Sequence, residues 1–415
     1  MSGGGGNDKD LLTFLPDDIL HEIPLRLCST NAAARTSLLS RNWRNLWTQI
    51  PDLQFHGDLA HVGSALSAYA ATILRSLRVT TLDVTPKAVE AILVLAAPLL
   101  TGEISIENVK EVEDDHYRSD DSFELPCFHK ATEIYLDLFI IGLELPASGV
   151  FLKLVSLCLH NMWLDGLCNL GEVVSSARCP LLQYLDLDNI FGLTNLTIHS
   201  KSLLCIELSN VEELQQITIV APMLDSLYVD LCFVGIQPMV DISAPALRII
   251  HWHDNCDMSW SKLKMVRLMN LSTTIAVYGP TGCRPYNKEL WRLFQHFQAI
   301  SILELQLMYP HIMDNCEYWL EAITMLPFTK TLSLELSTNG HVFGPCVFYL
   351  LSMSTRIRNL KLEIKRYNEK RTTCPSGCIC SRPEDMETDV VLLNSLMEVE
   401  IIGLSGVKHE ITFVE

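Results

Sequence analysis

Two short stretches of the sequence carry side chains that could bind a metal ion. In His251-Trp-His-Asp254 the two imidazoles are separated by one residue, so they would share one face of a β-strand. A divalent ion would still need one or two further ligands from neighbouring strands, for which Tyr228 and Asp230 are the candidates. The second stretch, Cys374-Pro-Ser-Gly-Cys378-Ile-Cys380, places three thiols among residues that favour turns.

Neither stretch completes a metal centre by itself. Three thiols fall short of the four ligands of a closed zinc site, and the paired Cys-x-x-Cys spacing is missing. We therefore favour a reduced loop at 374–380, with a zinc or redox role as the alternative. We expect neither a metal ion nor a cofactor in this protein.

Residues that could perform covalent catalysis are not arranged in any familiar motif. Gly403-Leu-Ser-Gly406 lacks the Gly-x-Ser-x-Gly order of a hydrolase nucleophile. The sequence also lacks a phosphate-binding loop, a dinucleotide fingerprint and a His-Glu-x-x-His pair. Because no motif brings a nucleophile to its base, we expect a non-catalytic protein, and a β-solenoid enzyme is the disfavoured alternative.

Composition excludes several classes of partner. The 415-residue chain has a formal net charge of -18, which argues against nucleic acid and anionic membranes, because both attract clustered Lys and Arg. The first ten residues are Gly-rich and acidic, unlike a secretory signal, and the longest apolar run, residues 88–100, is too short to span a bilayer. We expect a location in the cytoplasm or nucleus, with the 14 cysteines reduced.

The middle of the sequence repeats itself with an offset of 21 residues. This shift superimposes Leu182, Leu185, Leu187, Asn189, Leu193, Leu196 and Ile198 on Leu203, Ile206, Leu208, Asn210, Leu214, Ile217 and Ile219. Later copies keep Leu224, Leu227 and Val229, and then Leu247, Ile250 and Trp252 after a two-residue insertion. The pattern Leu-x-x-Leu-x-Leu at this spacing is typical of leucine-rich repeats, whose strands stack into a parallel sheet over a continuous core.

Strand-like alternation of apolar and polar residues continues outside these regular copies. It occurs at 134–138, 157–159, 303–307, 332–336, 360–364 and 399–401. The longer gaps leave room for short helices on the outer face at 287–297, 318–326 and 345–354, and the acidic stretch 111–122 is expected to be a solvated loop. The sequence therefore predicts an α/β protein: a curved solenoid with a parallel β-sheet on its concave face.

Polar residues between the inward-pointing positions would form two columns on the sheet face. The first column is Asp186, Glu207, Tyr228 and His251, and the second is Asp188, Ser209, Asp230 and His253. Solenoids commonly hold partners on such a face, so these residues are the candidate substrate-binding set. The alternative is ordinary strand polarity facing water, which needs no functional explanation.

The first sixty residues predict three short helices. Pro16 followed by two aspartates is a helix start, and the next apolar residues share one face until Pro24 ends or kinks the helix. A second helix would cover 32–39, and Trp43, Leu46 and Trp47 stand at helical offsets in the third. A domain this small is marginal alone, so it either docks on a partner or caps the solenoid.

The segments 15–20, 33–47 and 51–55 closely resemble the F-box of plant F-box proteins. The resemblance implies docking onto the Skp-family adaptor of a cullin-RING ubiquitin ligase. By motif position the adaptor contacts would be Leu15, Pro16, Ile19, Leu20, Ile23, Trp43, Leu46 and Trp47.

The end of the chain resembles the FBD-type region of plant F-box/LRR proteins, carried by the Cys loop and residues 393–411. Members of that family usually continue into a final helix, whereas this chain ends after a strand-like segment at 411–414. We therefore expect a truncated last repeat that lacks its cap. The uncovered apolar surface should lower the stability or solubility of the protein. The expected domains are a disordered tail (1–10), an F-box (11–56), a leucine-rich-repeat solenoid (57–365) and a Cys-containing loop with the FBD-like repeat (366–415).

Together these resemblances imply a substrate-recognition subunit of an SCF-type E3 ubiquitin ligase, itself non-enzymatic. Its partners would be the Skp-family adaptor, through it the cullin and RING subunits, and a protein substrate that the sequence does not identify. The alternative is a protein-interaction scaffold built on the same solenoid that delivers nothing for ubiquitination.

Overall fold

A computed structural model describes most of the chain. The described residues are 30, 46–109, 121–165, 169–211, 213–233, 239–254, 263–265, 267–282, 287–365, 378–381, 391–406, 410, 411 and 413. The chain divides into two compact units, Met1–Gly192 and Leu193–Glu415, each built around parallel strands. The predicted α/β class with a large parallel sheet is confirmed.

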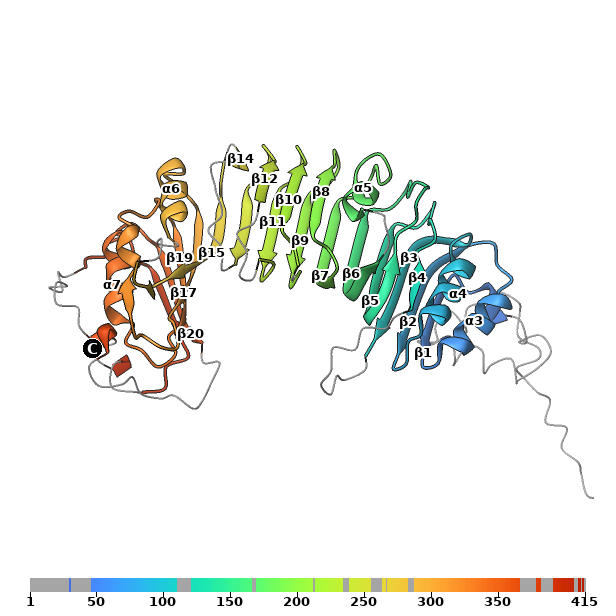
Figure 1. Cartoon of the computed structure of the whole chain (residues 1–415), viewed down its shortest axis with the longest axis horizontal. Helices are drawn as coiled ribbons and strands as arrows, with labels where there is room; N and C mark the ends of the chain where they lie inside the picture. Colours follow the sequence, from blue (N-terminus) through green and yellow to red (C-terminus); the bar gives the residue numbers. More distant parts are fainter. Residues whose placement is uncertain are drawn as a thin grey trace, which may run out of the picture. The chain divides into compact units, whose positions relative to one another are not determined.

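The first unit contains one parallel sheet with short helices beside it (Figure 1). Its sheet strands, in spatial order, are β1 (Asp52–His56), β2 (Leu74–Thr81), β3 (Leu100–Asn108), β5 (Glu133–Glu144), β6 (Ser156–Asp165) and β7 (Tyr184–Phe191), and β4 (Ser122–Glu124) pairs with the end of β5. The other elements are η4 (Leu46–Gln49), α3 (Leu59–Ser67), α4 (Pro86–Ala96) and α5 (Leu170–Val174).

Local sequence explains the helices of this unit. The Asp58 side chain accepts a hydrogen bond from the Ala60 amide at 2.8 Å and so caps the N-terminus of α3. Pro86 opens α4, where its missing N–H costs nothing. Helices α3 and α4 pack together and bury apolar side chains such as Val62 and Ile92.

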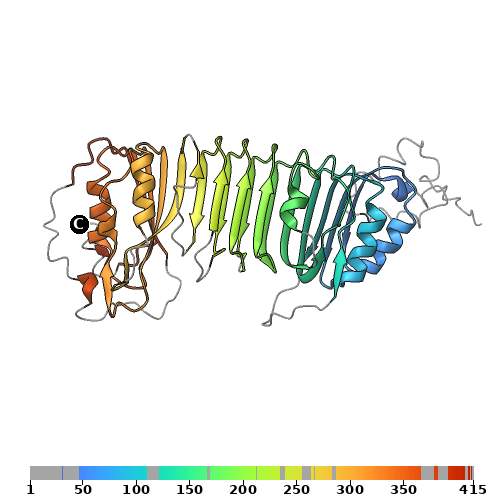
Figure 2. The same cartoon turned by 45° about the horizontal axis from the view of Figure 1, so that its top comes forward.

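The second unit has a main parallel sheet and a smaller second sheet (Figures 1 and 2). The main sheet comprises β9 (Cys205–Ser209), β11 (Ser226–Asp230), β13 (Ile249–His253), β15 (Asn270–Ala276), β17 (Ile302–Met308), β19 (Thr331–Ser337), β20 (Asn359–Lys365) and β21 (Glu398–Ile402). The second sheet comprises β8 (Asn195–His199), β10 (Gln216–Val220), β12 (Met239–Ser243) and β14 (Leu263–Lys264).

The remaining elements of the second unit connect later strands of the main sheet. They are β16 (Tyr278–Pro280), α6 (Lys288–His296), β18 (Cys316–Tyr318), η6 (Leu320–Ala322), α7 (Gly344–Ser352) and η7 (Ile379–Ser381). Strands β16 and β18 pair antiparallel.

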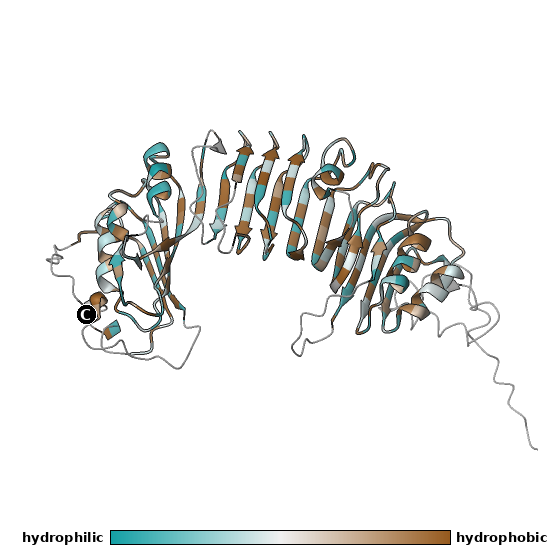
Figure 3. Cartoon of the chain, in the orientation of Figure 1, coloured by the Kyte–Doolittle hydropathy of each residue, from teal (hydrophilic) through white to brown (hydrophobic). Residues whose placement is uncertain are grey.

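The 21-residue offset found in the sequence is the register of the main sheet. Ile206 lies opposite Leu227, which lies opposite Ile250, and all three are at most 1% exposed. The repeat's other apolar pair builds the second sheet, where Ile217 lies opposite Leu196. Figure 3 shows the resulting alternation of hydrophobic and hydrophilic residues along these strands. Each regular repeat therefore encloses its core between two strands.

Two expectations about secondary structure need correction. Residues 318–326 do not form a full helix: β18 ends at Tyr318 and only a 3-10 turn, η6, comes after it. The reason is the pairing of β18 with β16, where the Trp319 ring occupies the space that a Cβ at Gly279 would need. The expected helices at 287–297 and 345–354 are confirmed as α6 and α7.

The segment 411–414 is the second correction, because Ile411 and Phe413 are helical rather than strand-like. The Phe413 ring packs 5.2 Å from that of Phe343 and 5.3 Å from that of Phe348 at α7. Just before it, the buried Glu410 carboxylate accepts the Ser405 amide at 2.7 Å. These contacts favour a compact turn over an extended strand.

Several other expectations fall outside the described residues. These are the first two F-box helices apart from Thr30, the tail 1–10, and residues 111–120 of the acidic loop. Within the described ranges no helix is both long and apolar enough to span a bilayer. The predicted domain boundaries and the lowered stability remain predictions, although all five residues of β21 are exposed.

Candidate functional site

The sheet face of the second unit contains an open hollow of about 330 Å³. It is lined by His251, His253, Ser272, Glu304, Leu305, Gln306, Ser333, Glu335, Lys361 and Glu363, which come from five neighbouring strands, β13 to β20. The backbone register aligns these polar residues in two rows across the strands, since each outward position lies opposite the next. The hollow is therefore a direct product of the strand alternation.

The predicted columns lie at one end of these rows. Within the second unit Glu207, Tyr228 and His251 lie side by side across β9, β11 and β13. Ser209, Asp230 and His253 do the same two positions further along those strands. Both histidines line the hollow, whereas Asp186 and Asp188 lie on β7 of the first unit.

His253 belongs to a hydrogen-bond network across four strands, β13, β15, β17 and β19. Its Nε2 lies 2.7 Å from the Ser272 hydroxyl and its Nδ1 lies 3.3 Å from Gln306 Oε1. Because Oε1 only accepts, we assign a proton to Nδ1 for the bond to Gln306, and the Ser272 hydroxyl then donates to Nε2. The Thr274 hydroxyl also donates to Gln306 Oε1 at 3.1 Å, and Gln306 Nε2 donates to Glu335 Oε1 at 3.0 Å. These bonds hold the imidazole in one orientation and occupy both of its nitrogens.

His251 makes an aromatic contact instead. Its ring stacks on Tyr228 with 4.4 Å between centroids and 16° between planes. Burial lowers the pKa of His251, and the neighbouring His253 acts in the same direction, while Glu304 opposes them. At neutral pH this imidazole is therefore uncharged.

Charged side chains cluster at the other end of the hollow. Lys365 lies 3.5 Å from Glu335 and 3.4 Å from Glu363, which also lies 3.4 Å from Lys361. The charge of Glu335 and the bonds to Glu363 raise the pKa of Lys365. Glu304 forms no ion pair with any residue that the structure describes. The hollow thus offers one carboxylate that a basic group could approach.

Ser272 and His253 resemble the first two members of a hydrolase triad, a pair that no motif in the sequence indicated. The third position is the amide of Gln306, which cannot stabilise an imidazolium as a carboxylate does. Ser272 is only 5% exposed, and the backbone amides of the strands around it are already used by the ladder, so they are not free to bind an oxyanion. The arrangement suits binding better than acyl transfer.

The first unit carries a different histidine site on β6 and β7. His160 Nε2 lies 2.9 Å from the Asp186 carboxylate, and Tyr135 contacts the imidazole edge-on at 5.1 Å. Burial alone would lower the pKa of His160, but the bond and charge of Asp186, helped by Asp188 and Asp137, outweigh it and raise the pKa. Of the predicted column residues, Asp186 is therefore already engaged in an ion pair.

Most of the predicted adaptor contacts lie outside the described residues. These are Leu15, Pro16, Ile19, Leu20, Ile23 and Trp43. Leu46 and Trp47 lie in η4, where Trp47 is half-buried.

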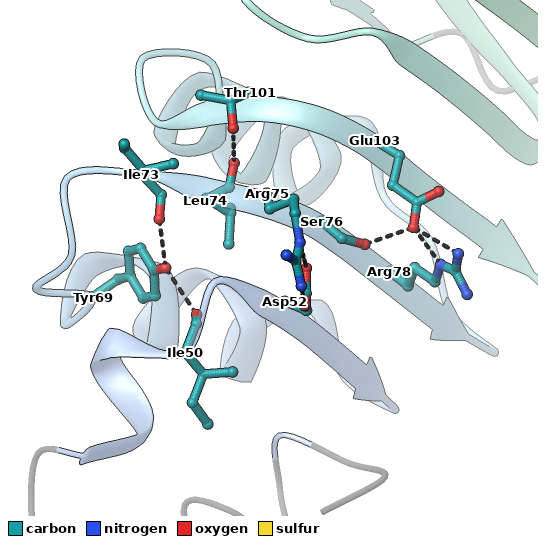
Figure 4. A network of polar contacts seen from close by, with 10 residues as sticks. All are labelled: Ile50, Asp52, Tyr69, Ile73, Leu74, Arg75, Ser76, Arg78, Thr101 and Glu103. Atoms are coloured by element: carbon teal, nitrogen blue, oxygen red, sulfur yellow. Dashed lines mark hydrogen bonds and ion pairs between the residues drawn. The ribbon is translucent and has the colours of Figure 1, made fainter. Parts of the chain in front are cut away.

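The C-terminal end of the predicted F-box is joined to the sheet of the first unit (Figure 4). Strand β1 pairs with β2, and the Asp52 carboxylate accepts the Arg75 Nε–H at 2.8 Å. The Tyr69 hydroxyl lies 2.9 Å from the Ile50 carbonyl oxygen, and the Gln54 amide donates to Thr30 Oγ1 at 2.6 Å. The end of this module is thus part of the first strand of the sheet.

Sequence reasoning missed most of the hollow, since only His251 and His253 of its lining residues were predicted. Glu304, Gln306, Glu335 and Lys361 lie in strands that the alternation had identified, at the same outward positions as the predicted columns. The columns were drawn only through the regular 21-residue copies. Extending them through every predicted strand would have found these residues.

Comparison with known proteins identifies an F-box domain at residues 12–54. A putative F-box/FBD/LRR-repeat protein from Arabidopsis thaliana is 29% identical over 59% of this chain and 52% of its own length. An F-box protein from the same plant is 30% identical over 47% of this chain and 64% of its own length. F-box/LRR-repeat protein 25, also from Arabidopsis thaliana, is 27% identical over 52% of this chain and 83% of its own length.

These similarities confirm the resemblance to plant F-box/LRR proteins that the sequence predicted. The matched part of the chain spans between about half and two thirds of the length of the first two relatives, at 52% and 64%.

Proposed function

We propose that this F-box/LRR protein is the substrate-recognition subunit of an SCF-type cullin-RING ubiquitin ligase. Its F-box would dock on the Skp-family adaptor, and the sheet face would hold the protein substrate. The observation that carries the proposal is the F-box domain at residues 12–54, supported by relatives named as F-box/LRR-repeat proteins.

The joint between the F-box and the sheet supports a delivery role. The F-box match ends inside β1, so the docking module and the first strand share residues instead of being connected by a free linker. The Asp52–Arg75 pair and the Thr30–Gln54 bond reinforce this joint. A module joined in this way transmits its orientation to the adjoining strands, which is what a subunit that positions a substrate requires.

The hollow around His253 is the proposed substrate contact. It combines fixed donors and acceptors with the stacked Tyr228–His251 pair, and Glu304 supplies a carboxylate. Protein interfaces favour rigid aromatic groups surrounded by satisfied polar ones. We propose that the bound substrate segment presents a basic side chain to Glu304. We also propose that this F-box/LRR protein performs no catalysis itself.

Adaptor binding is tested by co-expressing the full chain with a plant Skp-family protein. We expect a complex that co-purifies and that the double substitution Leu15→Ala and Pro16→Ala weakens at least about tenfold, because central apolar anchors carry most of the energy of an interface. The matched control is Glu304→Gln, which should bind the adaptor as the wild type does. Absence of a complex with the wild-type chain, measured by calorimetry, would refute the proposal.

The scaffold alternative predicts a different outcome once the adaptor is bound. In a reconstituted ligase the proposed receptor should be ubiquitinated itself, and the Leu15→Ala and Pro16→Ala variant should lose that modification. Adaptor binding without any transfer of ubiquitin would favour the scaffold. The proposed location, cytoplasm or nucleus, is checked by imaging a tagged chain in plant cells.

A further inference from the structure

Three metal-binding side chains from distant parts of the sequence converge in the second unit. Cys378 Sγ lies 3.5 Å from His341 Nδ1, and Cys380 Sγ lies 3.6 Å from the same atom. All three ligand atoms lie within 4.8 Å of one another. His341 lies after β19, while the two cysteines lie in the segment between β20 and β21, at the start of η7. This cluster is separate from the hollow on the sheet face.

Hydrogen bonding does not explain this convergence. One imidazole nitrogen offers a single proton or a single lone pair, so it can form one good hydrogen bond, not two equivalent ones with two thiols. A tetrahedral zinc ion with Zn–S of about 2.3 Å and Zn–N of about 2.0 Å separates sulfur from nitrogen by about 3.5 Å. The distances from His341 Nδ1 to the two sulfur atoms, 3.5 and 3.6 Å, match this sulfur–nitrogen separation.

Burial and support around His341 fit a structural metal site. His341 and Cys380 are each 3% exposed, and Cys378 is half-buried. The His341 amide donates to the Thr338 carbonyl oxygen at 2.9 Å, and the His341 ring stacks on Tyr309 with 6.3 Å between centroids. Outer contacts that orient a ligand are typical of metal sites.

The turn that presents His341 is itself held in place. Asn339 and Gly340 both have positive φ, at 49° and 83°, which reverses the chain directly after β19. The Asn339 side-chain amide donates to the Tyr309 carbonyl oxygen at 2.7 Å. The position of the imidazole is therefore fixed by the fold before any ion binds.

We propose that His341, Cys378 and Cys380 bind a Zn²⁺ ion that fastens the segment between β20 and β21 to the turn after β19. Binding releases one proton from each thiol and involves no oxidation or reduction. The site is structural, because two of its three ligands are buried and together they join two loops. The sequence alone suggested three thiols without a partner, and His341 lies 37 residues before Cys378.

The fourth ligand is a water molecule or Cys316. Cys316 is half-buried, and its thiol interacts electrostatically with that of Cys378. The substitution Cys316→Ser distinguishes the two choices.

Metal content of the full chain, purified with a reductant, tests the proposal. We expect about one zinc per chain by elemental analysis, and a thiolate-to-metal absorption band after exchange with Co²⁺. His341→Ala and Cys380→Ser should each weaken zinc affinity by more than about 100-fold, since even the loss of an outer contact costs 10–100-fold. The matched controls are His296→Ala, at an exposed position of α6, and Cys205→Ser, in β9.

Folding of the variants is checked separately, because two of the ligands are buried. For the wild type, we expect zinc to shield two or three thiols from a thiol reagent and chelation to lower the melting temperature. A wild-type chain that is free of zinc, or a cobalt band that survives both His341→Ala and Cys380→Ser, would overturn the proposal. The zinc proposal and the adaptor proposal can fail separately, because zinc content and adaptor binding are measured independently on the same samples.

Discussion

The two units place histidines on the same kind of strand face and give them opposite properties. His160 lies opposite Asp188 in the register, and carboxylates surround it, so its pKa is raised. His251 lies opposite Ser272 and stacks on Tyr228, so burial dominates and lowers its pKa. Position on the strand therefore determines which way a side chain points, while the neighbouring strands determine its charge.

The ends of the strands show a second contrast. Asn161 and Asn189 have φ values of 53° and 52°, and Leu231 has the same backbone conformation at 51°. In the first unit Asn189 Nδ2 donates to Asn161 Oδ1 at 2.7 Å, and Asn161 Nδ2 donates to Asp137 at 2.8 Å. Leucine can form no such ladder. The turn recurs in both units, but at Leu231 no side-chain amide is available to continue the ladder.

The largest effect is expected from breaking that ladder. Asn161→Ala removes two hydrogen bonds, each worth about 1 kcal/mol, and makes the left-handed conformation less favourable. We expect the first unit to lose about 2–3 kcal/mol, measured by denaturant unfolding with hydrogen exchange at the neighbouring amides.

The matched change in the second unit has the opposite sign. Leu231→Asn supplies a residue that tolerates positive φ, and Leu231 is 45% exposed, so little burial is lost. We expect the free energy of unfolding of the Leu231→Asn variant to rise by up to about 1 kcal/mol. Equal losses in both variants would show that the turn, and not the ladder, makes the difference.

The next effect concerns the charged histidine. The folded pKa of His160 is raised above its unfolded value of 6.5, so its stabilisation is fully present below pH 6.5 and is lost as the pH rises through the folded pKa. Asp186→Asn should cost about 1–2 kcal/mol at pH 6 and less at pH 8. Nuclear magnetic resonance titration of the ring measures the shift directly, and an unchanged His160 pKa in the variant would contradict the assignment.

The smallest effect is expected at the neutral histidine. The folded pKa of His251 is depressed below 6.5, so its contribution is present above pH 6.5 and is lost as the pH falls through the folded pKa. His251→Phe keeps the stack on Tyr228 and removes the titration. The free energy of unfolding of this variant should exceed that of the wild type by up to about 1 kcal/mol at pH 5. At pH 8 the two values should differ by at most about 0.5 kcal/mol. A melting series across pH tests this, and parallel curves for the two proteins would rule it out.

The sequence predicted the parts of the fold that repeat. Apolar residues such as Ile206 and Leu227 recur because each strand must bury the same face, and a recurring requirement leaves a period. Two residues of the hollow, His251 and His253, were predicted for the same reason. Its remaining members obey the same alternation in irregularly spaced strands.

Contacts between distant segments could not be predicted in this way. The bond between His253 and Ser272 depends on rotamers in two strands, and the approach of His341 to the cysteines spans more than one repeat. The helix expected at 318–326 does not form, because its first residue belongs to β18, which pairs with β16. The local sequence pattern contains no information about that pairing. Periodicity predicts the scaffold, whereas side chains that meet across it require coordinates.

The last described strand, β21, has a consequence for handling the protein. It pairs with β20 on one side, and apolar side chains such as Val399 and Ile401 are 50% and 37% exposed. No strand in the described part of the chain pairs with its other side, and such an edge next to apolar side chains is a template for a second copy. Concentrated samples would then grow by edge-to-edge stacking, so the size found in solution would depend on concentration and storage as much as on biology.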